Sequence, residues 1–225
     1  MKAPGVFIAG TDTGVGKTRV AAALLRTWAQ RGLRVAGMKP VAAGAALHGQ
    51  IWRNEDAEAL YAAASVRAPW EWVNPYCFAP SIAPHIAAQQ AGVRIEPARI
   101  SAAFDELRAR ADRIVVEGAG GLLVPLNEDV DMADVAGLLG LPVVLVVGMR
   151  LGCLNHALLT AEAIAARGLK FAGWVANSID PGMAEVEANL ALLEQRIAAP
   201  CIGHLAYGAS GEALNWATLE GLFRA

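Results

Sequence analysis

Cysteine is scarce in this chain. Three cysteines occur among its 225 residues, at Cys77, Cys153 and Cys201, and no two of them form a C-x-x-C pair. An odd, widely spaced set of this kind argues against a disulfide framework and against a cysteine zinc site. Such thiols are usually kept reduced inside the cell, so we expect a cytoplasmic protein.

Long apolar runs and an excess of charge are also missing. The longest apolar stretch, residues 138–147, contains Gly140 and Pro142 and is too short to cross a bilayer. The first residues have the pattern of a strand, so we expect neither a signal peptide nor a transmembrane helix. The formal net charge of -2 gives no case for a nucleic-acid or membrane partner.

Two common catalytic patterns are absent as well. No G-x-S-x-G sequence is present, and His85, His156 and His204 are scattered without metal-ligand spacing. With 55% hydrophobic and 18% charged residues, the composition is that of a compact globular protein. The length fits one large domain, so we expect residues 1–225 to form a single domain.

Short apolar, β-branched runs alternate with longer helical patterns. Strands that are apolar throughout are typical of a parallel sheet buried on both faces. The alternation predicts an α/β fold with a mostly parallel central sheet, helices on both faces, and ligands at the carboxyl ends of the strands. Residues 67–97, rich in proline and aromatics, are expected to form an ordered excursion over one face. The expected strands are 6–9, 35–38, 114–116, 143–147, 172–175 and 201–203, and the expected helices are 17–30, 55–64, 100–111, 132–139, 155–166 and 183–197.

Residues 10–18, GTDTGVGKT, lie between the first expected strand and the first expected helix. This order is typical of a phosphate-binding loop, in which backbone N–H groups and Lys17 hold phosphates and the Thr18 hydroxyl can bind Mg²⁺. It disfavours the alternative of a glycine-rich turn without a ligand. Five residues separate Gly10 from Gly16, one more than in the usual motif. This longer spacing narrows the set of phosphate-loop proteins to which the chain can be compared.

Other polar side chains stand at the ends of strands or the start of a helix. Lys39 follows the second strand, where it could neutralise a substrate anion; an exposed surface lysine is the alternative. Glu117 ends the third strand before the glycine-rich residues 118–121, a position from which an acid can reach Mg²⁺. Asp56 opens a helix and, on local evidence, complements the helix dipole. Asn177 fits a base-reading amide and a turn residue equally well.

Taken together, these motifs resemble the dethiobiotin synthetase family. The resemblance covers most of the chain, and after the phosphate loop its motifs are KPV at 39–41, RNxDA at 53–57, NPY at 74–76, PH at 84–85, EGAGG at 117–121, LGCxNHA at 151–157 and GWVAN at 173–177. It implies a single P-loop NTP-dependent ligase domain that forms a homodimer and uses ATP, Mg²⁺ and CO₂ to carboxylate 7,8-diaminononanoate. The carbamate formed on one amine becomes a carbamic–phosphoric anhydride, and the second amine closes the ureido ring.

The same resemblance implies roles for individual residues. Lys17 and Lys39 are expected to be catalytic, and Mg²⁺ is expected to be bound by Thr18, Asp56 and Glu117. This raises Asp56 from a helix-start acid to an expected metal ligand. The expected substrate contacts are Thr13, Lys39, Ala43 and, from the partner subunit, the loop of Leu151, Gly152, Cys153, Leu154 and Asn155. The expected nucleotide contacts are Gly14, Val15, Gly16, Lys17, Thr18, Arg19, Asp56, Glu117, Gly118, Ala119, Gly120, Asn177, Ser178, Ala206, Tyr207 and Gly208.

The chain departs from the family pattern in places. Ala43 stands where the family often has a serine, and Gly14 where an acidic residue is common. The alternative function is that of a regulatory or positioning ATPase of the same deviant P-loop superfamily. The signature loop of those proteins resembles KGGxGKT, and Asp12 occupies the place of its first lysine, which disfavours that alternative.

Overall fold

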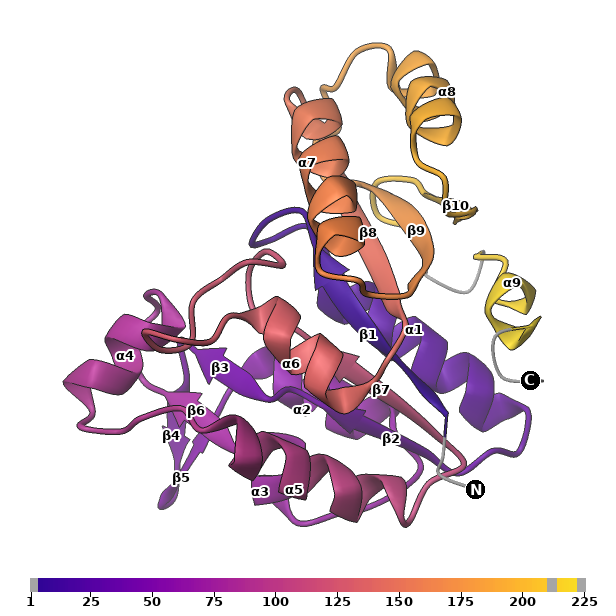
Figure 1. The fold of residues 1–225 in the computed structure, drawn as a ribbon. Coiled ribbons are helices and arrows are strands. Elements are labelled where there is room, and N and C mark those ends of the chain that lie inside the picture. Colours follow the sequence, from indigo (N-terminus) through magenta and orange to yellow (C-terminus); the bar gives the residue numbers. More distant parts are fainter. Residues whose placement is uncertain (1–3, 210–213, 222–225) are drawn as a thin grey trace.

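The structure is a computed structural model that describes residues 4–209 and 214–221. Residues 1–3, 210–213 and 222–225, which belong to the expected single domain of residues 1–225, lie outside the described residues. The core of the fold is a six-stranded sheet in the order β10-β9-β8-β1-β7-β2, in which neighbouring strands are parallel (Figure 1). Its strands are β1 (Gly5–Gly10), β2 (Val35–Met38), β7 (Arg113–Glu117), β8 (Val143–Met149), β9 (Phe171–Ser178) and β10 (Cys201–Leu205).

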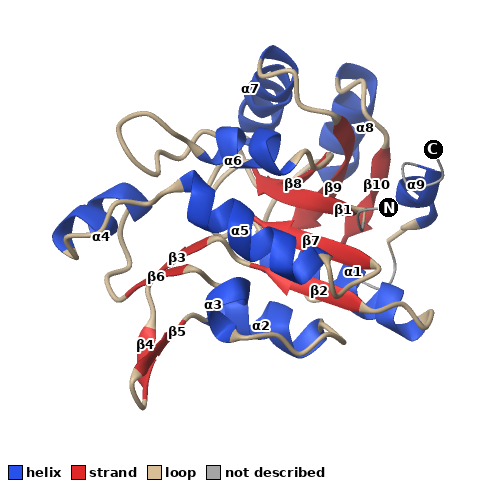
Figure 2. Cartoon of the chain, turned by 60° about the horizontal axis from the view of Figure 1, so that its bottom comes forward, coloured by secondary structure: helices blue, strands red, loops and turns tan. Residues whose placement is uncertain are grey.

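Helices cover both faces of this sheet (Figure 2). Successive side chains of a strand point to opposite faces, so Val6 and Ile8 pack on one side, whereas Phe7 packs on the other. The first side is covered by α1 (Lys17–Gln30), α2 (Glu55–Ala63) and α9 (Ala217–Glu220), and the second by α5 (Pro97–Arg108), α6 (Met132–Leu139), α7 (Cys153–Ala166) and α8 (Val186–Arg196). The predicted α/β architecture with a parallel, doubly covered sheet is confirmed.

An excursion between β2 and α5 covers the end of the sheet beside β2. The strands β3 (Val41–Ala43) and β6 (Tyr76–Phe78) pair in parallel, and β4 (Ala46–His48) and β5 (Ile51–Arg53) form an antiparallel hairpin. This segment also contains α2 and the short helices α3 (Trp70–Val73) and α4 (Pro84–Gln90). The stretch 67–97 is thus ordered, as expected, although its short elements were not predicted individually.

Several predicted boundaries were wrong. The helix expected over 100–111 is α5 and begins at Pro97, because proline is favoured in the first turn, where its missing N–H costs nothing. β9 continues through Ser178, since Asn177 and Ser178 pair with Gly148 and Met149 of β8. The helix expected from 183 begins at Val186, and the one expected from 155 begins at Cys153. Among the described residues, no helix is long and apolar enough to cross a membrane.

Candidate active site

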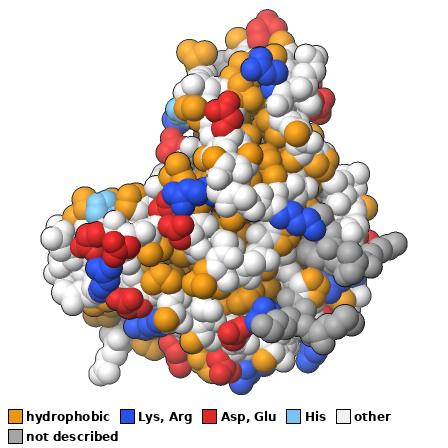
Figure 3. Space-filling view, in the orientation of Figure 1, with side chains coloured by type: hydrophobic (Ala, Val, Ile, Leu, Met, Phe, Trp, Pro, Cys, Tyr) orange, Lys and Arg blue, Asp and Glu red, His pale blue; other side chains and the backbone are white. Residues whose placement is uncertain are grey.

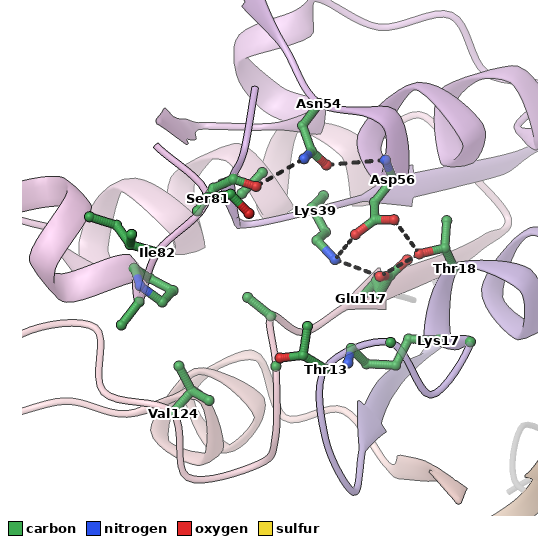
Figure 4. Close-up of a pocket in the computed structure, with 18 residues that line it drawn as sticks. Thr13, Lys17, Thr18, Lys39, Asn54, Asp56, Ser81, Ile82, Glu117 and Val124 are labelled. Atoms are coloured by element: carbon green, nitrogen blue, oxygen red, sulfur yellow. Dashed lines mark hydrogen bonds and ion pairs between the residues drawn. The ribbon is translucent and has the colours of Figure 1, made fainter. Parts of the chain in front are cut away.

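A cavity of about 590 Å³ opens at the carboxyl ends of β1, β2 and β7, between the sheet and the excursion (Figure 4). This is the edge at which an open parallel sheet binds its ligands. The described residues that line it are Thr13, Gly14, Gly16, Lys17, Thr18, Lys39, Ala42, Ala43, Asn54, Asp56, Ser81, Ile82, Ala83, Pro84, Glu117, Ala119, Gly120 and Val124.

The predicted phosphate loop forms one wall of the cavity. It joins β1 to α1 and turns through two glycines with left-handed backbone angles, Gly14 (φ 74°) and Gly16 (φ 90°), which L side chains rarely adopt. The side chain of Lys17 folds back over the loop and donates a hydrogen bond from Nζ to the carbonyl oxygen of Asp12 at 2.8 Å. The loop therefore presents an ammonium group and the free N–H groups of a helix N-terminus to one space, as phosphate binding requires.

A cluster of charged side chains lies across the cavity from Lys17. The ammonium of Lys39 lies 2.5 Å from Glu117 Oε1 and 2.9 Å from Asp56 Oδ2, and it donates to the Gly118 carbonyl oxygen at 3.2 Å. The Thr18 hydroxyl lies 2.7 Å from Asp56 Oδ1 and 2.9 Å from Glu117 Oε1 and can donate its proton to either oxygen. Lys39 and Glu117 are buried, so their charges pair away from water, whereas the Asp56 side chain is partly exposed.

Asp56 reaches this cluster because of the residue that begins its helix. Asn54 caps α2: its Oδ1 accepts from the backbone N–H of Asp56 at 3.1 Å and of Ala57 at 3.4 Å. The other end of the same amide donates from Nδ2 to the carbonyl oxygen of Ala43 at 3.2 Å. One side chain therefore joins the start of α2 to β3 and fixes the direction of the Asp56 carboxylate.

The backbone of Lys39 is fixed by the excursion. Its N–H donates to the carbonyl oxygen of Val73 at 2.7 Å, and its carbonyl oxygen accepts from Nδ2 of the buried Asn74 at 2.7 Å. Because the residue is held on both sides, the long side chain is aimed into the cavity. This gives the excursion a structural role at the site.

The two lysines differ in their electrostatics. Burial, reinforced by repulsion from Lys39, lowers the pKa of Lys17 to about 8. Burial would also lower the pKa of Lys39, but the Glu117 and Asp56 carboxylates outweigh it and raise that pKa. At Asp56 the attraction of Lys39 outweighs burial and lowers the carboxyl pKa. The two carboxylates thus favour the charged form of Lys39, whereas Lys17 carries a charge that its surroundings do not fully compensate.

The oxygen donors of the cluster fit a small divalent cation. Glu117 Oε2 is buried and has no hydrogen-bond partner among the described residues, which leaves a carboxylate oxygen unused. The described residues include no group of three or more His, Cys, Asp or Glu side chains that could hold a metal. Two carboxylates and a hydroxyl suit Mg²⁺, which binds a few protein oxygens and takes its remaining ligands from water and phosphate.

Some expected site residues lie outside the cavity. Asn177 contacts the phosphate loop from behind, where its amide engages Val15 and Arg19. Ser178 pairs with His204, with 2.8 Å between Oγ and Nε2. The others that do not line it are Val15, Arg19, Gly118, Ala206, Tyr207, Gly208, Leu151, Gly152, Cys153, Leu154 and Asn155.

Sequence reasoning missed several lining residues. Ser81, Ile82 and Val124 come from loops, and no local pattern marks them; Figure 4 shows Ile82 and Val124 on the side of the cavity away from Thr18. Asn54 could have been found, because an asparagine directly before a helical pattern is a capping signal. Ile82 and Val124 give the cavity an apolar wall on the side away from the charged cluster.

The fold and the phosphate loop define a P-loop nucleotide-binding protein. The chain is similar in fold to the septum site-determining protein MinD of Pyrococcus horikoshii complexed with Mg-ADP (TM-score 0.53, 17% identity, 97% of this chain and 86% of that one). It is likewise similar to the signal recognition particle receptor FtsY of Elizabethkingia anophelis (TM-score 0.55, 15% identity, 99% of this chain and 66% of that one). At these identities the likeness concerns the fold alone.

Sequence comparison identifies the family. A family model described as "AAA domain" matches residues 4–212. The ATP-dependent dethiobiotin synthetase of Aromatoleum aromaticum is 58% identical over 88% of this chain and 88% of its own length. That of Xylella fastidiosa is 52% identical over 95% of this chain and 93% of its own length. The chain belongs to the ATP-dependent dethiobiotin synthetase family, a family of ligases, and the resemblance seen in its motifs is confirmed.

The low pKa of Lys17 predicts a pH dependence of nucleotide binding. We expect affinity for metal-free ATP to fall as the pH rises above about 8, because a bound phosphate requires the protonated ammonium that the free protein loses there. The fall should approach about tenfold per pH unit. Calorimetry in buffers of different ionisation enthalpy should show proton uptake on binding. In the Lys17→Arg variant, whose guanidinium does not titrate in this range, ATP affinity should not change with pH. A wild-type affinity that does not change with pH would contradict the assignment of Lys17 to phosphate binding.

Proposed function

We propose that this chain is a Mg²⁺-dependent dethiobiotin synthetase that condenses 7,8-diaminononanoate with CO₂ at the expense of ATP. The observation that carries the proposal is the convergence of a phosphate loop and the Lys39–Asp56–Glu117 cluster on one cavity, in a chain 58% identical to an enzyme of that name. The site offers charge and positioning but no protein nucleophile, which suits a reaction whose substrate supplies its own nucleophiles.

The proposed reaction develops negative charge on the phosphates and on a carbamate, and the lysines of the cavity can stabilise both. One amine of the substrate adds to CO₂ and loses a proton to give a carbamate. A carbamate oxygen attacks the γ-phosphate and expels ADP, giving the anhydride, and the second amine then attacks the carbamoyl carbon and expels phosphate. Lys17 stabilises the charge of the phosphates, and Lys39 stabilises the carbamate and the transferring phosphoryl group. Thr13, Ala43, Ile82 and Val124 line the space left for the substrate.

The proposed cation site consists of Thr18, Asp56 and Glu117. When bound, Mg²⁺ would neutralise phosphate charge and orient the terminal phosphates of ATP. The free Oε2 of Glu117 supports this assignment, as do the two Asp56 oxygens directed at Thr18 and Lys39. For the rest of the nucleotide we propose contacts with the loop residues 13–19 and 117–120, and with 177–178 and 206–208 around the base.

We further propose one P-loop ligase domain over residues 1–225, acting in the cytoplasm as a homodimer. All described elements are arranged around one six-stranded sheet, and the three thiols are free. Leu151 is 96% exposed beside the first turn of α7, and Leu138 and Leu159 are also exposed. Hydrophobic side chains gather over α7 and α6 (Figure 3). This surface suits a partner subunit whose substrate would reach the N–H groups of residues 151–155.

The function is tested by supplying purified protein with MgATP, ¹³C-bicarbonate and 7,8-diaminononanoate and detecting dethiobiotin by mass. We expect labelled product in a one-to-one ratio with ADP, and none when EDTA is present. ATP hydrolysis that does not depend on the diamine and yields no dethiobiotin would refute the proposal and favour the regulatory ATPase.

A shared site predicts complementation between two inactive chains. Lys17→Ala removes the phosphate-loop charge, and Asn155→Pro removes one backbone N–H from the first turn of α7. In a heterodimer of the two, one of the two sites keeps both parts intact. Heterodimers isolated with two different tags should therefore show about half of wild-type turnover, above either variant alone. No recovery in verified heterodimers would count against a site built from both subunits.

A further inference from the structure

Asn177 is expected at the base of the nucleotide, but the structure shows its side chain bonded to the phosphate loop. The residue lies in β9 and is 2% exposed. Its Nδ2 donates to the carbonyl oxygen of Val15 at 2.8 Å, and its Oδ1 accepts from Nη1 of Arg19 at 3.1 Å. One buried amide therefore contacts both the loop and the first turn of α1.

The loop is shaped to receive this amide. Gly16 has a left-handed backbone, and a Cβ added there would lie 2.2 Å from Asn177 Nδ2, closer than any two such atoms can approach. The amide thus packs directly on the loop backbone between Val15 and Lys17. A shift of this side chain would change the path of the segment that carries the phosphate-binding N–H groups.

The contacts leave part of the amide unused. A primary amide has two N–H donors and two lone pairs. Val15 takes one donor and Arg19 one lone pair, so one donor and one lone pair remain. This is the complement that a base edge needs, so hydrogen bonding to a base would not require the amide to release the loop.

We propose that Asn177 is a positioning residue that holds the phosphate loop in its binding conformation, in addition to any contact with the base. The proposal rests on the nucleotide binding proposed above. Without the amide, the Val15 carbonyl loses its buried partner and the loop gains freedom. The apparent affinity is then the intrinsic affinity multiplied by the fraction of molecules that keep the competent loop, and this holds for every ligand whose phosphates bind there.

The decisive comparison uses ligands with and without a base. Wild type and Asn177→Ala are titrated by calorimetry with metal-free ATP and with inorganic tripolyphosphate. We expect both dissociation constants to rise in the variant, by about tenfold for tripolyphosphate and by at least as much for ATP. Hydrogen exchange of the free protein should become faster in the peptide that contains residues 10–18.

Control variants distinguish positioning of the phosphate loop from base reading and from a general effect of losing an asparagine. Asn189→Ala removes an amide of the same type, which donates to the Glu185 carbonyl oxygen at 2.7 Å on α8, and it should change neither constant. Asn177→Ser, a milder change, serves if the alanine variant does not fold, and should show the same parallel loss. A loss confined to ATP would make Asn177 a base reader only and overturn the proposal, as would unchanged binding of both ligands. If wild type binds neither ligand, the proposed function itself fails.

Discussion

Lys39→Met should lose both turnover and stability. In the proposed reaction the carbamate and the transferring phosphoryl group then lose the positive charge of Lys39, and a group of this kind typically contributes about 3 kcal/mol or more, or at least a hundredfold in rate. The substitution also leaves the buried Glu117 carboxylate and Asp56 without their cation. Breaking a buried ion pair on one side costs about 3–5 kcal/mol. Steady-state assays and thermal unfolding measure the two effects.

Two further results sharpen the test of Lys39. Affinity for ATP should stay within about tenfold of wild type, because the ground-state phosphate contacts remain with the loop. Lys170→Met, at an exposed position, removes the same charge and should leave turnover and melting temperature unchanged. A Lys39→Met protein with wild-type melting temperature would show that the ion pairs are not stabilising. One with full turnover would make Lys39 a structural lysine.

The elements that carry the phosphate loop were predictable because they obey local rules. Residues 6–9 are apolar and include the β-branched Val6 and Ile8, glycines follow, and a helical pattern begins at Lys17, as α1 does. β4 and β5 could not be found in this way: each has three residues, and their side chains are mostly exposed, so they carry no periodic apolar pattern. The hairpin is defined by pairing of Ala46 with Arg53 rather than by composition.

The site was predictable in its parts but not in its arrangement. Glu117 ends β7 and Lys39 directly follows β2, and these two strands are neighbours, so their convergence follows from the sheet. Asp56 was different, since a helix-start acid has a sufficient local explanation. The family resemblance gave it a role at the site, and the contacts of its carboxylate with Lys39 and Thr18 bring it into the charged cluster. The Asn177 contact with Val15 joins segments far apart in the chain, and no local pattern contains it.

Lys17→Met should abolish turnover and yet leave the protein at least as stable as wild type. Lys17 is buried, and its pKa is lowered to about 8 by burial and by Lys39, so its charge is more costly in the folded state than in the unfolded chain. This cost is fully present below pH 8 and is relieved as the pH rises towards the unfolded pKa. Removing the charge at neutral pH relieves it too, by up to about 3 kcal/mol.

The same charge is what the phosphates need. Its loss should weaken ATP binding and lower turnover by at least about a hundredfold, so Lys17→Met and Lys39→Met should both be inactive but should differ in the direction of their stability change. Thermal unfolding of the two variants and wild type at neutral pH, without nucleotide, makes the comparison. A Lys17→Met protein that unfolds well below wild type would show that Lys17 is a structural cation. The phosphate-loop assignment would then have to rest on the backbone alone.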